Sequence, residues 1–362
     1  MVEIDIRPVW RFRAKGEREF DFLLLKLLEA LEETGKLTVA AQRAEVSYRH
    51  AWNVIEKWAA ILGAPLVQMQ RGRGTRLSPL GAKLLWAGKR VQARLTPQLD
   101  SLASEFASAL NEALDQGGPA LRVQASHDFA VAALRELGPK AGVTLDVQYR
   151  GSFDALGSLA RGECELAGFH IVDGPFGQRM AERYAQWLKP RAHRLISIAT
   201  RTQGLIVANG NPKAIRSVAD LARKGVRLIN RQKGSGTRAL TEYLLSEAQI
   251  DRNRVNGYQN EEFTHAAVAA LIAGGQADAG FGVEAAAAQF RLGFVPLATE
   301  RYFLVCRQEH LARPEVETLL AVLRGPAFRS VIQSLAGYTA PCAGEVTAVA
   351  DAVKMAEQTV SL

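Results

Sequence analysis

A glycine-rich turn that opens a helix is the first feature of this sequence that suggests chemistry. The segment Asn230–Leu245 reads NRQKGSGTRALTEYLL, so Ser235 lies between two glycines and Thr237 follows them. A helix start presents unpaired backbone N–H groups and a positive dipole end, and both attract anions. The turn lacks the GxxxxGK[ST] spacing of a nucleotide-binding loop. It therefore indicates a site for a small anion, to which Arg238 adds a charge unless it pairs with a nearby carboxylate.

Three further junctions between a predicted strand and a predicted helix have the same character. They lie at residues 126–127, 151–152 and 261–265, and glycine and hydroxyl side chains are common among them. Such groups donate neutral hydrogen bonds to an oxyanion without supplying a full countercharge, whereas histidine and arginine add charge. The predicted ligand contacts are Ser126, His127, Ser152, Ser235, Gly236, Thr237, Arg238, Thr264 and His265.

The elements around these junctions alternate between strand and helix. LRVQAS and LDVQYRG are typical of strands, and HDFAVAALREL and FDALGSLARG are typical of helices. This alternation predicts an α/β fold with a parallel sheet flanked by helices. The segment from Gly162 to Ala167 is echoed from Gly275 to Gly280. Two similar lobes would produce this echo, and a cleft between lobes is a natural ligand site.

Positive charge is concentrated in the amino-terminal third of the chain. The whole protein of 362 residues carries a net charge of +8, and the segment from Lys36 to Arg94 holds eleven basic residues against two acidic ones. A basic surface confined to one module favours a polyanionic partner such as nucleic acid, although an ordinary solvated surface is the alternative.

Three helical patterns precede a glycine- and arginine-rich turn in the same region. Apolar residues recur from Phe22 to Leu31 before Gly35 stops the first helix, and Ser47 is a suitable N-cap for YRHAWNVIEKWAAIL. The order predicts a helix-turn-helix followed by a β-hairpin wing over PLVQMQRGRGTRLS. The predicted DNA contacts are Ser47, Tyr48, Arg49, His50, Asn53, Lys57, Arg71, Arg73 and Arg76.

This module resembles a known family of regulators. AAQRAEVSYRHAWNVIEKWAAILGAPLV followed by RGRGTRLSPLGAKLL is similar to the winged helix of LysR-type regulators, and especially of the molybdate-responsive ModE regulators. The resemblance implies sequence-specific binding of a homodimer to double-stranded DNA with a two-fold-symmetric operator. We expect a helix-rich winged helix-turn-helix domain over 1–78 and a linker or dimerisation helix over 79–116.

The linker helix carries the repeat that an interhelical seam needs. Leu95, Leu99, Leu102, Phe106 and Leu110 recur every three or four residues. Pro97 lies within this run and is expected to kink or split the helix. A helix packed on its own chain is the alternative reading, and the choice between a dimer and a tetramer stays open.

The carboxy-terminal part resembles a second family. GLIVANGNP, RLINRQKGSGTRAL, THAAVAALIAGGQADAGFGVEAAA and VPLATERYFLV are similar to the periplasmic-binding-protein-like domain related to molybdate-binding proteins. The resemblance implies an effector domain over 120–362 with two lobes joined by a hinge, which holds an anion at helix starts. We expect the hinge near Val207 and Gly280. His127 and Asp128 depart from the small hydroxyls usual in that family, and the small molybdate-binding repeats that end ModE regulators are not recognisable.

Together these features predict a cytoplasmic transcriptional regulator that senses a small oxyanion. Molybdate or tungstate is favoured as the effector, which suggests control of molybdenum-uptake or molybdoenzyme genes; formate or another small carboxylate is the alternative. An enzyme related to the molybdenum cofactor would need acid/base pairs such as His127 with Asp128 or His265 with Glu262. No catalytic residue, cofactor or enzymatic activity is predicted. A ligand-independent architectural DNA binder is the third reading.

Metal and membrane binding are not expected. Cys164, Cys306 and Cys342 are far apart, odd in number and outside any CxxC pairing, which argues against a disulfide scaffold and a zinc site. They are read as small buried residues. Because no apolar run approaches about 20 residues and no signal-peptide core opens the chain, a membrane partner is not predicted.

Overall fold

The computed structural model describes residues 2–13, 18–70, 74–114 and 120–351. It divides into two compact units. One is Arg7–Ala93, and the other joins Met1–Ile6 to Arg94–Leu362. The helix α4 (Pro79–Ala113) contributes residues to both units. In the described part of the chain, no helix is both long enough and apolar enough to cross a membrane.

The first unit is a winged helix-turn-helix. Its elements are β1 (Arg11–Phe12), β2 (Arg18–Glu19), α1 (Leu23–Thr34), α2 (Leu37–Arg43), α3 (Tyr48–Leu62), β3 (Val67–Gln70) and β4 (Gly74–Leu77). Strands β3 and β4 pair antiparallel as the predicted hairpin. Gly35 ends α1 in the left-handed conformation with φ of 64°, which a residue without a Cβ adopts at little cost. The predicted order of elements is confirmed.

Helix α3 is fixed by its cap and by its apolar face. The Ser47 hydroxyl accepts a hydrogen bond from the His50 N–H at 3.1 Å, as expected for an N-cap. Ala51, Ile55 and Trp58 are buried against α1 and α2. Packing of this face turns the opposite face of α3 toward solvent.

Helix α4 runs without interruption for 35 residues. It continues through Pro97, so the split, one of the two expectations, is wrong, and the kink stays a prediction. The Ser101 hydroxyl donates to the Pro97 carbonyl at 3.0 Å. Leu102 and Phe106 are each 54% exposed, and their role in an interhelical seam stays a prediction.

The second unit is built on a mixed sheet. Its strands are β5 (Leu121–Ala125), β6 (Leu145–Tyr149), β7 (Leu166–Val172), β8 (His193–Val207), β9 (Leu228–Arg231), β10 (Glu261–Glu262), β11 (Ala279–Val283), β12 (Gly293–Arg307), β13 (Tyr338–Thr339) and β14 (Val346–Ala348). The order is β10-β9-β11-β8-β12-β7-β5-β6, with β13 and β14 also paired to β8. Strand β6 is therefore an edge strand.

Helices follow most of these strands, as the alternating pattern predicts. They are α5 (Phe129–Leu137), α6 (Ser152–Arg161), α7 (Pro175–Tyr184), α8 (Gly236–Glu247), α9 (His265–Ala273), α10 (Glu284–Gln289), α11 (Pro314–Arg324) and α12 (Pro326–Gln333). Short 3₁₀ helices are η1 (Pro139–Ala141), η2 (Val218–Ala222), η3 (Arg252–Arg254) and η4 (Gln308–Ala312).

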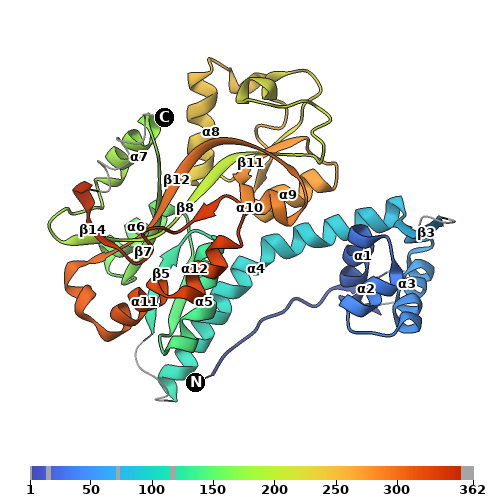
Figure 1. Cartoon of the computed structure of the whole chain (residues 1–362), viewed down its shortest axis with the longest axis horizontal. Coiled ribbons are helices and arrows are strands. Elements are labelled where there is room, and N and C mark those ends of the chain that lie inside the picture. Colours follow the sequence, from blue (N-terminus) through green and yellow to red (C-terminus); the bar gives the residue numbers. More distant parts are fainter. Residues whose placement is uncertain (1, 14–17, 71–73, 115–119, 352–362) are drawn as a thin grey trace. The chain divides into compact units, whose positions relative to one another are not determined.

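Two long strands join the two lobes of this unit. Lobe I contains β5 to β7, and lobe II contains β9 to β11, while β8 and β12 run through both (Figure 1). Strand β12 pairs with β7 from Glu300 onward, and β8 pairs with β11 from Gln203 to Val207. The strands pass between lobes near Gln203 and Glu300. The hinge expected at Val207 and Gly280 is therefore wrong, because both residues lie inside the β8–β11 ladder.

The predicted internal echo corresponds to a structural repeat. In lobe I, Glu165 accepts hydrogen bonds from the backbone N–H and guanidinium of Arg122 at the start of β5. In lobe II, Asp278 does the same for Arg227 just before β9. Glu165 comes directly before β7, which pairs in parallel with β5, and Asp278 comes directly before β11, which pairs in parallel with β9. In each lobe, one carboxylate thus links the starts of two neighbouring parallel strands by hydrogen bonds.

Candidate functional site

The predicted strand–helix junctions converge on one cavity of about 540 Å³ in the second unit. Lobe I contributes the starts of α5 and α6, and lobe II contributes the starts of α8 and α9. Of the predicted ligand contacts, the cavity is lined by Ser126, His127, Ser152, Ser235, Gly236, Thr237, Thr264 and His265. The structure therefore brings together groups from four separate places in the sequence.

Backbone donors are available at the helix starts. In α8, the first internal acceptor is the Ser235 carbonyl, which receives the Ala239 N–H at 3.1 Å. The N–H groups of Gly236 and Thr237 precede it and have no acceptor within the helix. Helix α6 starts in the same way at Ser152, which is buried. These ends direct positive dipole character into the cavity.

The hydroxyls of Ser235 and Thr237, in the glycine-rich turn before α8, differ in whether they can donate a hydrogen bond to a ligand. The Thr237 hydroxyl accepts from the Gln203 amide at 2.9 Å, which leaves its own hydrogen to donate to a ligand. The Ser235 hydroxyl donates to the Gln232 carbonyl at 3.0 Å and accepts from the Arg238 N–H at 3.1 Å. Ser235 therefore shapes the turn, and Thr237 is the better donor.

Arg238 is not among the residues that line the cavity. Its guanidinium donates to Glu242 at 2.9 Å and to Glu261 at 3.3 Å, and it lies over the Tyr258 ring, 4.3 Å from the centroid. This is the carboxylate pairing that the sequence left open. The Thr264 hydroxyl accepts from the Ala267 N–H at 3.0 Å and thereby caps α9.

Arg231, the last residue of β9, is the main cavity residue that sequence reasoning missed. Only 7% of it is exposed. Its Nη2 donates to the Phe263 carbonyl at 2.9 Å, and its Nη1 has no hydrogen-bond partner among the described residues. Burial, with a contribution from Arg201, lowers the pKa of the Arg231 guanidinium to about 9. Such an incompletely satisfied buried cation is a strong point of attraction for an anion.

Arg201 is buried in the same cavity, but acidic groups surround it. Its guanidinium forms ion pairs with Asp128 and Glu300. Asp128 also accepts from the Tyr338 hydroxyl at 2.7 Å and from the Ala130 N–H at 2.7 Å. The Asp128 carboxylate is therefore engaged by other groups than His127, which weakens the acid/base pair that an enzyme would need.

Three histidines line the cavity as neutral groups. Burial lowers the pKa of His127 and lowers those of His170 and His265 well below 6.5. For His265, the charges of Arg231 and Arg201 lower the pKa further. In the described structure, His170 Nε2 and His265 Nδ1 have no hydrogen-bond partner. Neutral imidazoles can donate or accept hydrogen bonds according to their tautomer.

Sequence signals for the missed residues differ in strength. Arg231 ends a strand directly before the glycine-rich turn, and side chains at strand ends reach such clefts, so its position was a usable signal. Arg201 and His170 lie within β8 and β7, and all seven residues of β7 are buried. Nothing in that pattern distinguishes a core face from a cavity face.

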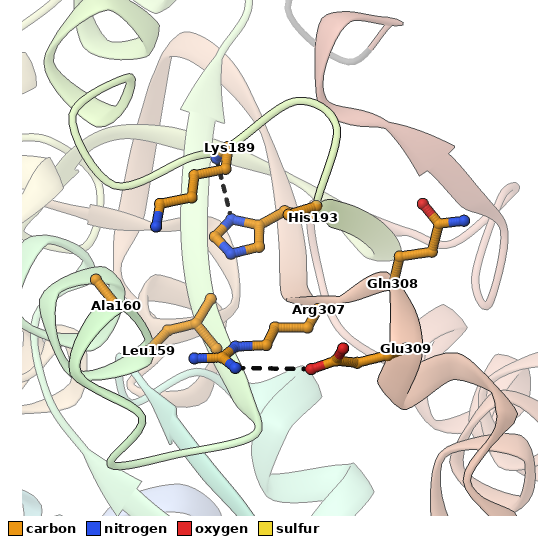
Figure 2. Close-up of a pocket in the computed structure, with 8 residues that line it drawn as sticks. Leu159, Ala160, Lys189, His193, Arg307, Gln308 and Glu309 are labelled. Atoms are coloured by element: carbon orange, nitrogen blue, oxygen red, sulfur yellow. Dashed lines mark hydrogen bonds and ion pairs between the residues drawn. The ribbon is translucent and has the colours of Figure 1, made fainter.

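A second cavity, of about 570 Å³, lies beside the start of β8 and the end of β12 (Figure 2). The His193 ring accepts from the Lys189 N–H at 3.1 Å, and Arg307 pairs with Glu309 at 3.6 Å. Arg307 and Glu309 are 47% and 71% exposed. Water solvates these charges, so this cavity is a weaker candidate than the one between the lobes.

The predicted DNA contacts that the structure describes lie on exposed surface. Six residues of α3 and its cap are exposed, namely Ser47, Tyr48, Arg49, His50, Asn53 and Lys57. Arg76 on β4 is also exposed, whereas Arg71 and Arg73 lie outside the described residues. These seven side chains are therefore accessible, whereas Ala51 in α3, Val67 in β3 and Thr75 in β4 are buried.

Histidine, cysteine and acidic residues do not gather into a ligand cluster within the described ranges. No group of three or more histidine, cysteine or acidic residues is placed to hold an ion there. Cys164 and Cys306 are buried, but Cys342 is exposed, so the expectation of three buried cysteines is wrong for Cys342.

Comparison with known proteins gives two family matches. The family model of the PBP superfamily domain matches residues 134–324. The model of the bacterial regulatory helix-turn-helix protein, lysR family, matches residues 22–82.

Several relatives are similar over parts of the chain. The uncharacterized protein YvgK of Bacillus subtilis is 33% identical over 201 residues, which are 55% of this chain and 64% of YvgK. The chain thus spans less than two thirds of that relative. The molybdenum transport protein ModE of Herbaspirillum seropedicae is 33% identical over 72 residues, 19% of this chain and 27% of ModE. An H2O2-bound OxyR mutant of Corynebacterium glutamicum has a TM-score of 0.44 at 16% identity, covering 86% of this chain and 94% of OxyR.

Proposed function

Because the chain belongs to the PBP superfamily through residues 134–324 and carries a lysR-family helix-turn-helix domain over residues 22–82, we propose that it is a ligand-responsive transcriptional regulator. Helix α3 and the wing bind double-stranded DNA, and the cavity between the lobes binds a small oxyanion. The regulator acts as a homodimer or a tetramer on a two-fold-symmetric operator.

The observation that carries the ligand role is the donor set around Arg231. Its buried guanidinium has an open Nη1, and the backbone and hydroxyl donors of Gly236, Thr237 and Ser152 line the same cavity. Buried polar groups are normally satisfied in folded proteins, and a ligand is one means of satisfying them. An anion supplies acceptors for all of these donors at once.

Molybdate or tungstate is the favoured effector. Most donors in the cavity are neutral, and a tetrahedral oxyanion spreads its charge over four acceptor oxygens that separate helix starts can reach. The partial identity to a protein named for molybdenum transport supports the same choice. Control of molybdenum-uptake or molybdoenzyme genes would follow from this effector.

Formate or another small carboxylate is the second candidate. A guanidinium presents a planar pair of donors that matches a carboxylate. Among the guanidinium groups that line the cavity, Arg94 and Arg201 pair with acidic residues and Arg150 is exposed, whereas Arg231 is buried and its Nη1 has no partner in the described structure. The cavity volume of about 540 Å³ also falls within the ~300–1,000 Å³ typical of sites for organic ligands.

Thermal unfolding with single anions tests the ligand role. We expect one of molybdate, tungstate, sulfate, phosphate or formate to stabilise the full-length protein, by about 2.7 kcal/mol at a hundred times its dissociation constant. The Arg231→Met variant should lose this stabilisation, because it keeps an unbranched apolar stem but removes the guanidinium donors. Arg254→Met, at an exposed position in η3, is the matched control. Equal stabilisation of both variants would contradict the assignment.

Selection from a random duplex library tests the DNA role. We expect a two-fold-symmetric sequence to emerge, and Asn53→Ala to relax its base preference. Arg76→Ala and Arg73→Ala should weaken binding to all sequences and lower the salt slope by about 1 each. Selection of no common sequence would argue for the architectural reading, and turnover of the stabilising anion would argue for the enzyme.

A further inference from the structure

Helix α4 forms one wall of the cavity that contains Arg231. Arg94, Gln98, Ser101 and Leu102 lie on this helix and line the cavity together with residues of both lobes. All of them belong to the second unit. The helix that continues into the helix-turn-helix unit is therefore also part of the ligand-binding cavity.

Two serines attach α4 to lobe I. The Ser104 hydroxyl accepts from the Val147 N–H at 2.9 Å, and the Ser101 hydroxyl accepts from the Tyr149 N–H at 3.0 Å. Both N–H groups belong to β6, the edge strand. Serines three residues apart on the helix thus match alternate residues on the strand. Asp100 adds an ion pair with Arg135 at 2.7 Å.

Arg94 contacts lobe II. Its Nε lies 3.4 Å from Glu262 Oε2, and its guanidinium carbon lies 5.3 Å from the centroid of the Phe263 ring. The Phe263 carbonyl in turn accepts from Arg231 Nη2 at 2.9 Å. One short segment between β10 and α9 therefore contacts both the linker helix and the candidate anion-binding arginine.

The charge of Glu262 gives this contact an energetic consequence. Glu262 is fully buried, while Arg94 is 41% exposed in its side chain. The Glu262 carboxylate acts electrostatically on Arg231, so it also opposes an anion placed there. With α4 docked, Arg94 adds positive charge beside this carboxylate; with α4 displaced, that contribution is lost. An anion therefore has a higher affinity for the docked arrangement.

We propose that Arg94 is a positioning residue that couples anion binding in the cavity to the docking of α4. The inference rests on the proposed function, since the coupled output is DNA binding. A ligand shifts an equilibrium only through different affinities for its two states, and the Arg94–Glu262 contact supplies this difference. Anion binding holds α4 against both lobes, and loss of the anion releases its contact with lobe II.

The test compares anion and DNA affinities in full-length variants. The anion probes are molybdate, tungstate, sulfate, phosphate and formate, and the DNA probe is the duplex selected by the wild-type protein. We expect Arg94→Met to bind the anion about tenfold more weakly and to lose the effect of the anion on DNA affinity. Arg94→Lys should retain most of both effects, because it keeps the charge. The control Arg254→Met should behave like the wild-type protein.

A second variant separates the two roles of Arg94. In Arg94→Met/Glu262→Gln the opposing charge is gone, so anion affinity should return to within about threefold of wild type while the DNA response stays lost. Hydrogen exchange over residues 94–106 should slow with anion in the wild-type protein but not in the double variant. Such protection reports docking of the helix rather than overall stability.

The outcomes distinguish this inference from the proposed function. If the anion changes the DNA affinity of the wild-type protein and of Arg94→Met equally, only the coupling role of Arg94 is overturned. If none of these anions binds the wild-type protein, or if binding leaves its DNA affinity unchanged, the proposed function and this inference fall together.

Discussion

At the scale of the residue, burial keeps the cavity histidines neutral. The pKa of His127 is lowered, and those of His170 and His265 are lowered well below 6.5. When the pH falls below 6.5, the unfolded chain takes up protons on these residues, whereas the folded chain does not. These histidines therefore do not lower the free energy of unfolding above pH 6.5. They lower it progressively as the pH falls from 6.5 toward their folded pKa values.

This difference predicts an acid-sensitive stability. We expect the free energy of unfolding to decrease between pH 6.5 and pH 5, with each neutral histidine contributing up to about 1.4 kcal/mol per pH unit. His265→Gln should flatten the profile by up to that amount. Urea unfolding at closely spaced pH values measures both effects. Parallel profiles for the two proteins would show that His265 is protonated in the folded state.

At the scale of the element, the contact between α4 and β6 depends on two hydroxyls. Removing one leaves a strand N–H without its acceptor, which costs about 1–3 kcal/mol if the group stays buried. We expect Ser104→Ala to destabilise the second unit in this range, because Val147 is buried. The exchange rate of the Val147 amide measures the local effect.

Two variants serve as controls for the Ser104 prediction. Ser104→Thr keeps the hydroxyl and should retain the protection of Val147, whereas Ser108→Ala changes the same helix one turn further on. If Ser104→Ala exchanges at the wild-type rate, the hydrogen bond between helix and strand contributes nothing to docking.

Elements with local signals were predictable from the sequence. Gly35 and Ser47 mark a helix end and a helix start by their own chemistry, and the strand–helix junctions at Ser126 and Ser152 follow from the alternating pattern. Strand-borne cavity groups such as His170 were not predictable, because a fully buried strand gives no sign of which face meets a cavity. The docking of α4 depends on contacts distant in sequence, such as Ser104 with Val147.

At the scale of the whole molecule, binding of anion and DNA must be reciprocal if one equilibrium links them. An anion that changes the DNA dissociation constant tenfold supplies about 1.4 kcal/mol of coupling, and saturating DNA must then change the anion dissociation constant by the same factor. Titrating the stabilising anion with and without the selected duplex measures this factor. Unequal factors under identical salt conditions would exclude a single linked equilibrium.

The edge position of β6 has a consequence for how this protein is divided into fragments. An uncovered edge strand presents a row of backbone groups that can pair with a strand of another molecule, and this is a route to aggregation. Helix α4 covers that row at Val147 and Tyr149. A fragment that begins after residue 120 would expose it and would be prone to self-associate through its sheets, whereas one that begins before Arg94 would keep its cover and remain dispersed.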